Sequence, residues 1–147
     1  PDMWQAHQMD LAQEYRVGTY VFNDSSLVRR GVCSWRDCAL TVLATVVSVP
    51  AENRAIIDAG SKVLTSDLLG LSGHGHVLGH PDISIDTLSE EHGRLVSAAP
   101  IRLRVGDRLR IVPNHVCTSV NMLDEVQLMR GDQLQGTARI AARGQVR

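Results

Sequence analysis

The longest apolar run of the chain, residues 39–49, does most to restrict its fold. The run is rich in β-branched residues, has only Thr and Ser as polar interruptions, and stops at Pro50. This composition favours a long buried strand over a helix. Residues 50–53 carry the turn signals of Pro and Asn. We therefore expect residues 54–58 to form a short strand, the hairpin partner of the long one.

Short β-prone runs between turn residues continue along the rest of the chain. Two of them, residues 124–130 and 133–141, flank Gly131-Asp132, and this pattern predicts a hairpin. Further strands are expected at residues 15–24, 81–88, 94–98 and 108–112. A loop is expected at residues 68–81, and a loop or short helical turn at residues 25–37 and 118–123.

Many short strands at close spacing indicate a mostly-β fold, a β-barrel or sandwich of short antiparallel strands with little helix. The chain has 147 residues, which is enough for one domain with a hydrophobic core. It shows no internal repeat and no second domain boundary. The sequence therefore predicts a single β-rich domain over residues 1–147, in which residues 1–14 are an irregular lead-in.

Charge and apolar patterning argue against several classes of protein. The formal net charge is -1 at pH 7, too small for bulk attraction to nucleic acid or to an anionic membrane surface. No apolar run approaches the roughly 20 residues that span a bilayer. The three cysteines are odd in number and too few for a disulfide scaffold. They indicate a reducing compartment, and we expect a cytoplasmic protein.

Residues 113–117 hold the most suggestive pair of side chains, His115 and Cys117, directly after an expected strand. In an extended segment, side chains two positions apart point to the same face. An imidazole nitrogen and a thiolate could then aim at one point, and zinc accepts both ligands. Two ligands do not close a structural metal site, however. The alternative is a buried cysteine beside a hydrogen-bonded histidine.

Two other stretches contain histidines that could bind a metal or act as a general base. His74, His76 and His80 lie in the glycine-rich loop, where a zinc cluster is conceivable. The glycines disfavour any regular structure that would align the three rings, so loop-packing or exposed histidines are the default. His92 follows two glutamates and precedes a glycine. It could serve as a general base, and the alternative is a capped turn between two strands.

Lys62 is the only lysine of the chain, against fourteen arginines, and it lies four residues after Asp58. A Schiff-base role is conceivable for a lysine. An exposed or ion-paired side chain is the expectation that we prefer here.

Four stretches occur in an order that characterises one family: residues 18–24, 58–67, 88–93 and 105–117. The most specific motifs among them are Glu-Glu-His-Gly at 90–93 and Pro-Asn-His-Val-Cys at 113–117. Residues 142–144, Ala-Arg-Gly near the end of the chain, fit the same family pattern. Together the stretches resemble the carboxy-terminal part of the D-serine dehydratase and D-threonine aldolase family, over nearly the whole chain.

The resemblance implies an enzyme of two domains. Pyridoxal phosphate and its Schiff-base lysine belong to an amino-terminal, alanine-racemase-like barrel. The carboxy-terminal domain is β-rich and supplies a divalent metal, whose ligands fall here on His115 and Cys117. The cysteine resembles the dehydratase branch and implies zinc, since thiolates select softer ions. His92 is then expected to act in catalysis, and Asn114 to orient the ligands.

The same resemblance implies a D-3-hydroxy amino acid as substrate and a homodimer as assembly. It also implies that residues 1–14 follow a missing pyridoxal-phosphate barrel. The chain would then be the carboxy-terminal metal-binding domain of a lyase, a fragment that is inactive alone. The alternative is a stand-alone, non-catalytic β-domain that binds metal or mediates dimerisation.

Overall fold

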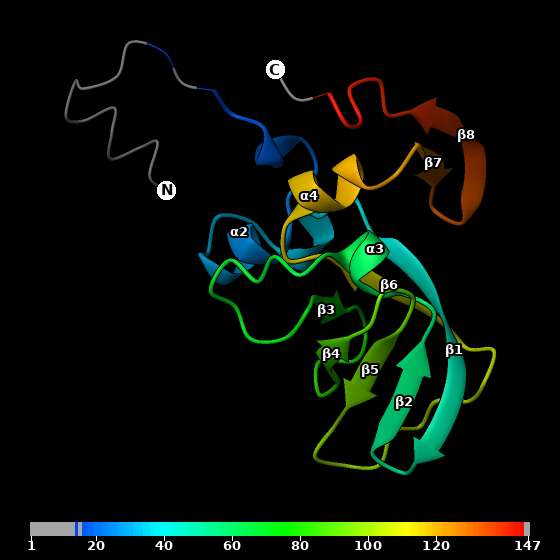
Figure 1. Ribbon diagram of the computed structural model, residues 1–147. Helices are drawn as coiled ribbons and strands as arrows, with labels where there is room; N and C mark the ends of the chain where they lie inside the picture. Colours follow the sequence, from blue (N-terminus) through cyan, green and yellow to red (C-terminus); the bar gives the residue numbers. More distant parts are fainter. Residues whose placement is uncertain (1–13, 15, 146–147) are drawn as a thin grey trace.

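The computed structural model describes residue 14 and residues 16–145 (Figure 1). Apart from Glu14, the expected lead-in lies outside the described residues. Six strands form one antiparallel sheet in the order β3-β6-β1-β2-β5-β4. These strands are β1 (Val42–Ala51), β2 (Arg54–Ile57), β3 (His76–Val77), β4 (Ser84–Leu88), β5 (Gly93–Val96) and β6 (Arg108–Val112). The expected mostly-β fold of short antiparallel strands is confirmed.

The sheet curls into a nearly closed barrel, because its two edge strands approach one another. The backbone N–H of His74, just before β3, donates to the carbonyl of Ile85 in β4 at 2.9 Å. This bond satisfies backbone groups that a sheet edge would otherwise leave exposed.

The predicted long strand is confirmed as β1, but it begins three residues later and ends two residues later than expected. Val42, Ala44 and Val46 point inward and are buried, whereas Leu43 and Val47, on the other face of the strand, are exposed. The strand passes through Pro50, where the pairing with β2 is irregular. Proline cannot donate a backbone hydrogen bond, and an irregularity of this kind accommodates it. The turn therefore shrinks to residues 52–53.

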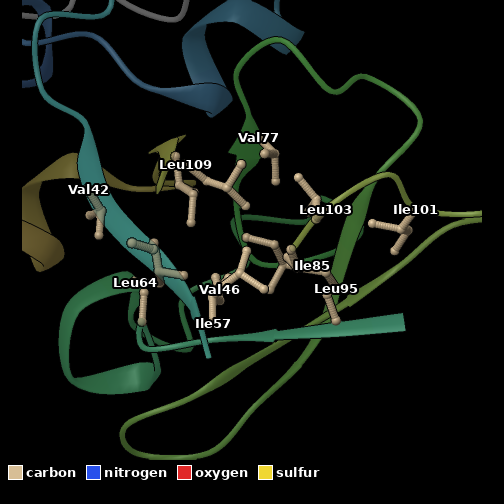
Figure 2. Close-up of a cluster of buried hydrophobic side chains, with 14 residues drawn as sticks. Val42, Val46, Ile57, Leu64, Val77, Ile85, Leu95, Ile101, Leu103 and Leu109 are labelled. Atoms are coloured by element: carbon tan, nitrogen blue, oxygen red, sulfur yellow. The ribbon is translucent and has the colours of Figure 1, made fainter. Parts of the chain in front are cut away.

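The core fills the interior of the barrel (Figure 2). The strands β1, β2 and β6 contribute alternate apolar side chains to this core, and β3, β4 and β5 contribute Val77, Ile85 and Leu95. Leu64 enters from α3 (Ser61–Leu64). Burying an aliphatic side chain of this size contributes about 1.5–3 kcal/mol. The fully enclosed large apolar side chains are Val46, Ile57, Leu64, Val77, Ile85, Leu95, Ile111, Val112 and Val116.

Short helices gather at one end of the barrel (Figure 1). They are η1 (Thr19–Val21), α2 (Ser25–Arg29), η2 (Trp35–Asp37), α3 and α4 (Val116–Asn121). The helical turns expected within residues 25–37 and 118–123 are confirmed, although α4 begins two residues early. No helix among the described residues is long and apolar enough to cross a membrane.

The strand expected at residues 15–24 is wrong where the structure describes it. The segment instead contains η1, and Asn23 adopts a left-handed φ of 55° that turns the chain. Asp24 then caps α2 by accepting a hydrogen bond from the backbone N–H of Leu27. Turn and cap formation override the β-propensity of the aromatic and β-branched residues.

The predicted hairpin around Gly131-Asp132 is confirmed as β7 (Glu125–Arg130) and β8 (Gln133–Arg139). These strands form a separate two-stranded sheet that lies apart from the six-stranded one (Figure 1). Most of its side chains are exposed. The hairpin follows α4, so the two ends of that helix connect to two different sheets.

Candidate functional site

Residues 113–117 leave β6 at the helical end of the barrel, and the start of α2 holds them in place. The N–H of Ser25 donates to the carbonyl of Pro113 at 3.1 Å, and the Ser25 hydroxyl donates to the carbonyl of Val112 at 3.1 Å. The N–H of Ser26 donates to the carbonyl of Asn114 at 3.3 Å. Two segments far apart in sequence are thereby fixed side by side.

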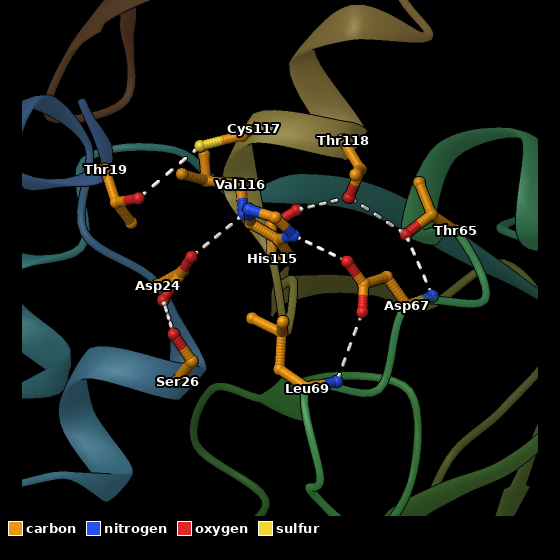
Figure 3. A network of polar contacts seen from close by, with 10 residues as sticks. All are labelled: Thr19, Asp24, Ser26, Thr65, Asp67, Leu69, His115, Val116, Cys117 and Thr118. Carbon is orange, nitrogen blue, oxygen red and sulfur yellow. Dashed lines mark hydrogen bonds and ion pairs between the residues drawn. The ribbon is translucent and has the colours of Figure 1, made fainter. Parts of the chain in front are cut away.

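The buried carboxylate of Asp24 is the centre of this arrangement (Figure 3). Its Oδ1 accepts hydrogen bonds from the Ser26 hydroxyl at 2.7 Å and from the N–H of Leu27 at 3.2 Å. Its Oδ2 accepts from the N–H of Val116 at 3.0 Å. A buried charge is tolerated when it is fully hydrogen-bonded. One side chain therefore caps both α2 and α4.

The cap on α4 decides how His115 and Cys117 are presented. His115 has extended backbone angles, φ -131° and ψ 104°, but Cys117 lies in the first turn of α4. The expectation that both residues share one extended segment is therefore wrong at Cys117. The Cys117 Sγ lies 3.4 Å from the Thr19 hydroxyl of η1. The Cys117 side chain is exposed, and that of His115 is 24% exposed.

The imidazole of His115 is held from one side by Asp67. The Asp67 Oδ2 lies 2.6 Å from the His115 Nδ1. This hydrogen bond is the main reason that the pKa of Asp67 falls below its usual range. The second oxygen of Asp67, Oδ1, accepts a hydrogen bond from the N–H of Leu69 at 3.2 Å.

The donors at this point fit a zinc ion chemically. Histidines that bind metal usually engage their second ring nitrogen with a carboxylate or carbonyl, as Asp67 engages Nδ1 here. All three cysteines are described and free, and Cys117 is the exposed one. By contrast, burial raises the pKa of Cys38 to about 11. Within the described residues, no group of three or more His, Cys, Asp or Glu side chains could hold a metal. A metal here would have at most two ligands from His115 and Cys117, and that assignment stays a prediction.

His92 lies in the tight turn between β4 and β5. The N–H of Ser89 donates to the His92 carbonyl at 2.8 Å, and the N–H of His92 donates to the Ser89 hydroxyl at 3.1 Å. The side chain is exposed, and its ring makes no hydrogen bond to any described residue. The local structure is thus the capped turn given as the alternative, and the catalytic role of His92 stays a prediction.

Lys62 forms an ion pair with Glu91 across the contact between α3 and this turn. The hydrogen bond to Glu91 raises the pKa of the lysine above its ordinary value. The amine of Lys62 is thus engaged by a carboxylate within this chain. The expectation of an ion-paired lysine is confirmed.

The glycine-rich loop packs one of its histidines against a tryptophan. The ring of His76 stacks on that of Trp35, with centroids 3.8 Å apart. Burial and the nearby Arg29 lower the pKa of His76. A polar pocket of about 240 Å³ opens beside this stack. Asn114 lines the pocket and donates from its amide to the carbonyl of Gly73 at 2.8 Å, so its hydrogen bond anchors this loop.

Comparison with known proteins decides the family. The model of the putative serine dehydratase domain matches residues 39–129, more than half of the chain. The chain belongs to the D-serine dehydratase and D-threonine aldolase family. The resemblance identified from the sequence is therefore confirmed.

Members of the family match this chain over two very different lengths. An uncharacterized protein of Mycobacterium tuberculosis is 40% identical over 131 residues, which is 84% of this chain and 98% of that protein. The D-threo-3-hydroxyaspartate dehydratase of Delftia sp. is 33% identical over 151 residues, 90% of this chain but 40% of that enzyme. This chain therefore corresponds to a whole protein in one case and to part of one in the other.

Solved structures of the family share the fold. The Delftia dehydratase matches with a TM-score of 0.73 and 35% identity, over 84% of this chain and 38% of the enzyme. A D-threonine aldolase from Filomicrobium marinum matches with a TM-score of 0.72 and 32% identity, over 86% and 35%. A mutant of a D-threo-3-hydroxyaspartate dehydratase in the metal-free form also matches, with a TM-score of 0.73.

Sequence reasoning did not single out two carboxylates of the candidate site, Asp24 and Asp67. A sequence signal existed for Asp24, because Asp followed by Ser-Ser-Leu is a helix-capping pattern. Asp67 ends the stretch 58–67 that resembles the family, but nothing in the sequence indicated its contact with His115, 48 positions away. Thr19 likewise reaches Cys117 across 98 positions.

Proposed function

We propose that this chain is the carboxy-terminal metal-binding domain of a lyase that acts on D-3-hydroxy amino acids and requires pyridoxal phosphate. The observation that carries the proposal is the His115 ring, tied through Nδ1 to Asp67 beside the exposed Cys117 thiol. Relatives named as a D-serine dehydratase, a D-threo-3-hydroxyaspartate dehydratase and a D-threonine aldolase support the substrate class. The relative in a metal-free form supports the metal.

In this proposal, His115 and Cys117 hold a divalent ion, and zinc suits this pair of nitrogen and sulfur donors best. A zinc ion there would supply Lewis-acid polarisation of the substrate's 3-hydroxyl group. The contribution of this chain is to hold the two donors. Asp24 fixes the start of α4, and therefore the backbone position of Cys117.

In this proposal pyridoxal phosphate is bound by a preceding domain, because Lys62, the one lysine of this chain, is paired with Glu91. The isolated chain is then inactive as a lyase. We extend the proposal to a cytoplasmic homodimer, with His92 close to the substrate.

Zinc titration of the purified chain tests the metal pair. We expect one zinc ion per chain, measured by competition with a chromophoric chelator. Cys117→Ala should lose this binding, because it removes the only proposed sulfur ligand. Cys33→Ala is the matched control and should keep it, because Cys33 is half-buried and lies in another segment. Equal zinc binding by the wild type and Cys117→Ala would disprove the assignment of His115 and Cys117 as the zinc ligands.

A coupled assay for pyruvate tests the absence of independent activity. The chain, supplied with pyridoxal phosphate, zinc and D-serine, should release no pyruvate above the rate without protein. Sustained release would contradict the proposal that the Schiff-base lysine lies in another domain.

A second function is favoured by the mycobacterial relative, of which this chain covers 98%. Proteins of this length could serve as stand-alone β-domains that bind metal or dimerise without catalysing a reaction. The reading frame upstream of Pro1 separates the two candidates. A frame that encodes a barrel supports the lyase, and a start codon close to Pro1 supports the stand-alone domain.

A further inference from the structure

We propose that Asp67 is the positioning residue that makes His115 a competent metal ligand. This inference rests on the proposed function, because it concerns the ring that would bind the metal. It adds a residue that the family motif at 113–117 does not contain. It also assigns a purpose to the irregular loop at residues 65–69.

The first step of the argument concerns the protons on the imidazole. A carboxylate accepts hydrogen bonds and does not donate them when ionised. The 2.6 Å contact therefore requires a proton on the His115 Nδ1. In the neutral ring, Nε2 then carries the free lone pair, which is the atom a metal needs. Without Asp67, no carboxylate would favour the proton on Nδ1 over the proton on Nε2.

The second step concerns the carboxylate, which is itself held in place. Its Oδ1 accepts the hydrogen bond from the Leu69 N–H, while Oδ2 accepts from His115. Both oxygens are therefore engaged within the protein. The geometry points to Asp67 as a support for the ligand rather than as a third ligand.

A chain of hydroxyl groups closes a ring of hydrogen bonds around this contact (Figure 3). The Thr118 hydroxyl donates to the carbonyl of His115 at 3.0 Å, and it lies 3.2 Å from the Thr65 hydroxyl. Since the Thr118 proton is used, Thr65 donates to Thr118. The Thr65 oxygen in turn accepts from the N–H of Asp67 at 3.4 Å. Asp67 thus holds both the ring and, indirectly, the backbone of His115.

The loop that presents Asp67 is strained, which indicates that its shape is maintained by these contacts. Thr65 has φ 60° and ψ 170°, and Leu69 has φ 48°. The first is a conformation that essentially only glycine adopts, and it is energetically unfavourable for any other residue. Thr65 is also β-branched, which makes the conformation still less favourable. Strain of this kind persists where surrounding contacts over-determine it.

The test compares Asp67→Asn with Asp132→Asn, a matched control in the exposed β7–β8 turn. The imidazole tautomer of His115 is read by nitrogen NMR in the metal-free chain at pH 8.5. We expect Nδ1–H in the wild type and in Asp132→Asn. In Asp67→Asn the amide can also donate, so the Nε2–H form should appear.

Zinc affinity by chelator competition is the second readout. Asp67→Asn should bind zinc about 10- to 100-fold more weakly, the usual effect of losing such a support. Thr118→Val keeps the side-chain shape but opens the ring of hydrogen bonds, and it should weaken binding about 2- to 10-fold. Asp132→Asn should bind as the wild type does. Near-ultraviolet circular dichroism checks that each variant is folded.

The outcomes separate this inference from the proposed function. If Asp67→Asn keeps both the wild-type tautomer and the wild-type zinc affinity, the inference is wrong. If the wild type shows Nδ1–H but binds no zinc, the metal assignment is overturned, while the role of Asp67 in fixing the ring stands.

Discussion

At the scale of residues, the site depends on carboxylates that join distant segments. His115 and Cys117 could be selected from the sequence, since their chemistry and spacing lie within one motif. Asp24 and Asp67 act across 92 and 48 positions, so their contacts depend on the folded chain. The candidate donor pair could thus be named from the sequence and stays a prediction, whereas the long-range contacts of Asp24 and Asp67 could not be predicted.

Asp24 should be among the most important polar residues for stability. Asp24→Ala removes the caps of α2 and α4 and leaves the buried N–H of Val116 without a partner. Losing a cap costs about 1 kcal/mol, and an unsatisfied buried donor about 1–3 kcal/mol. We expect the free energy of unfolding, measured by urea titration, to fall by about 2–4 kcal/mol.

Asp82→Ala provides the comparison for Asp24→Ala. Asp82 is exposed, in the turn before β4, and its replacement should change stability by no more than about 0.5 kcal/mol. If the two variants lose the same stability, Asp24 is not the double cap described here.

At the scale of elements, strands whose β-prone residues are bounded by turn residues were predicted well. The strands at 54–58, 94–98 and 108–112 and the hairpin at 124–141 are all present within a few residues. The strand at 15–24 was wrong because a helix cap and a left-handed Asn23 decided the structure there. The β-propensity of a segment predicts its structure poorly where one carboxylate caps the starts of two helices.

The contact between α3 and the β4–β5 turn is unusually tight. The N–H groups of Ser61 and Lys62 donate to the carbonyls of Ser89 and Glu90 at 2.8 and 3.1 Å. A Cβ on Gly60 would lie 2.3 Å from the carbonyl oxygen of Glu90. No rotamer relieves a clash with backbone, so only glycine fits at this position.

Gly60→Ala should therefore lower the free energy of unfolding by about 1–3 kcal/mol, the usual cost of overpacking, or more. Gly18→Ala is the matched control, since a Cβ there meets nothing within 4 Å. Thermal unfolding followed by circular dichroism gives the comparison. A melting temperature of Gly60→Ala equal to that of Gly18→Ala would show that the contact is looser than described.

The β4–β5 hairpin also contributes a pH dependence. Arg94 donates two hydrogen bonds to Asp86, at 2.9 and 2.8 Å, and they hold the pKa of that carboxyl below its usual range. A lowered folded pKa stabilises the fold above the unfolded pKa, and this contribution is lost as the pH falls through the folded pKa. Stability should thus decrease below about pH 4.

Melting temperatures between pH 2 and pH 6 test this dependence. Asp86→Asn cannot titrate, so its melting temperature should fall less steeply than that of the wild type below pH 4. The difference should be small, because both side chains are partly exposed. Identical slopes in the two proteins would rule out a contribution from this ion pair.

At the scale of the whole molecule, the barrel acts as a scaffold for its helical end. The mostly-β class followed from the sequence because many short strands restrict the architecture strongly. The near closure of the sheet did not, since it depends on a two-residue strand, β3, inside a loop rich in glycine. The site sits where η1, α2, α3 and α4 meet above this scaffold (Figure 3).

The central claim is that this scaffold presents one imidazole and one thiolate to a single divalent ion. X-ray absorption at the zinc edge tests it most directly, because the scattering shell distinguishes sulfur from nitrogen and oxygen. For the chain loaded with one equivalent of zinc, we expect one sulfur at about 2.3 Å and an imidazole nitrogen at about 2.0–2.1 Å. Cys117→Ala should lose the sulfur. A zinc shell without sulfur in the wild type, or the same sulfur in Cys117→Ala, would contradict the account.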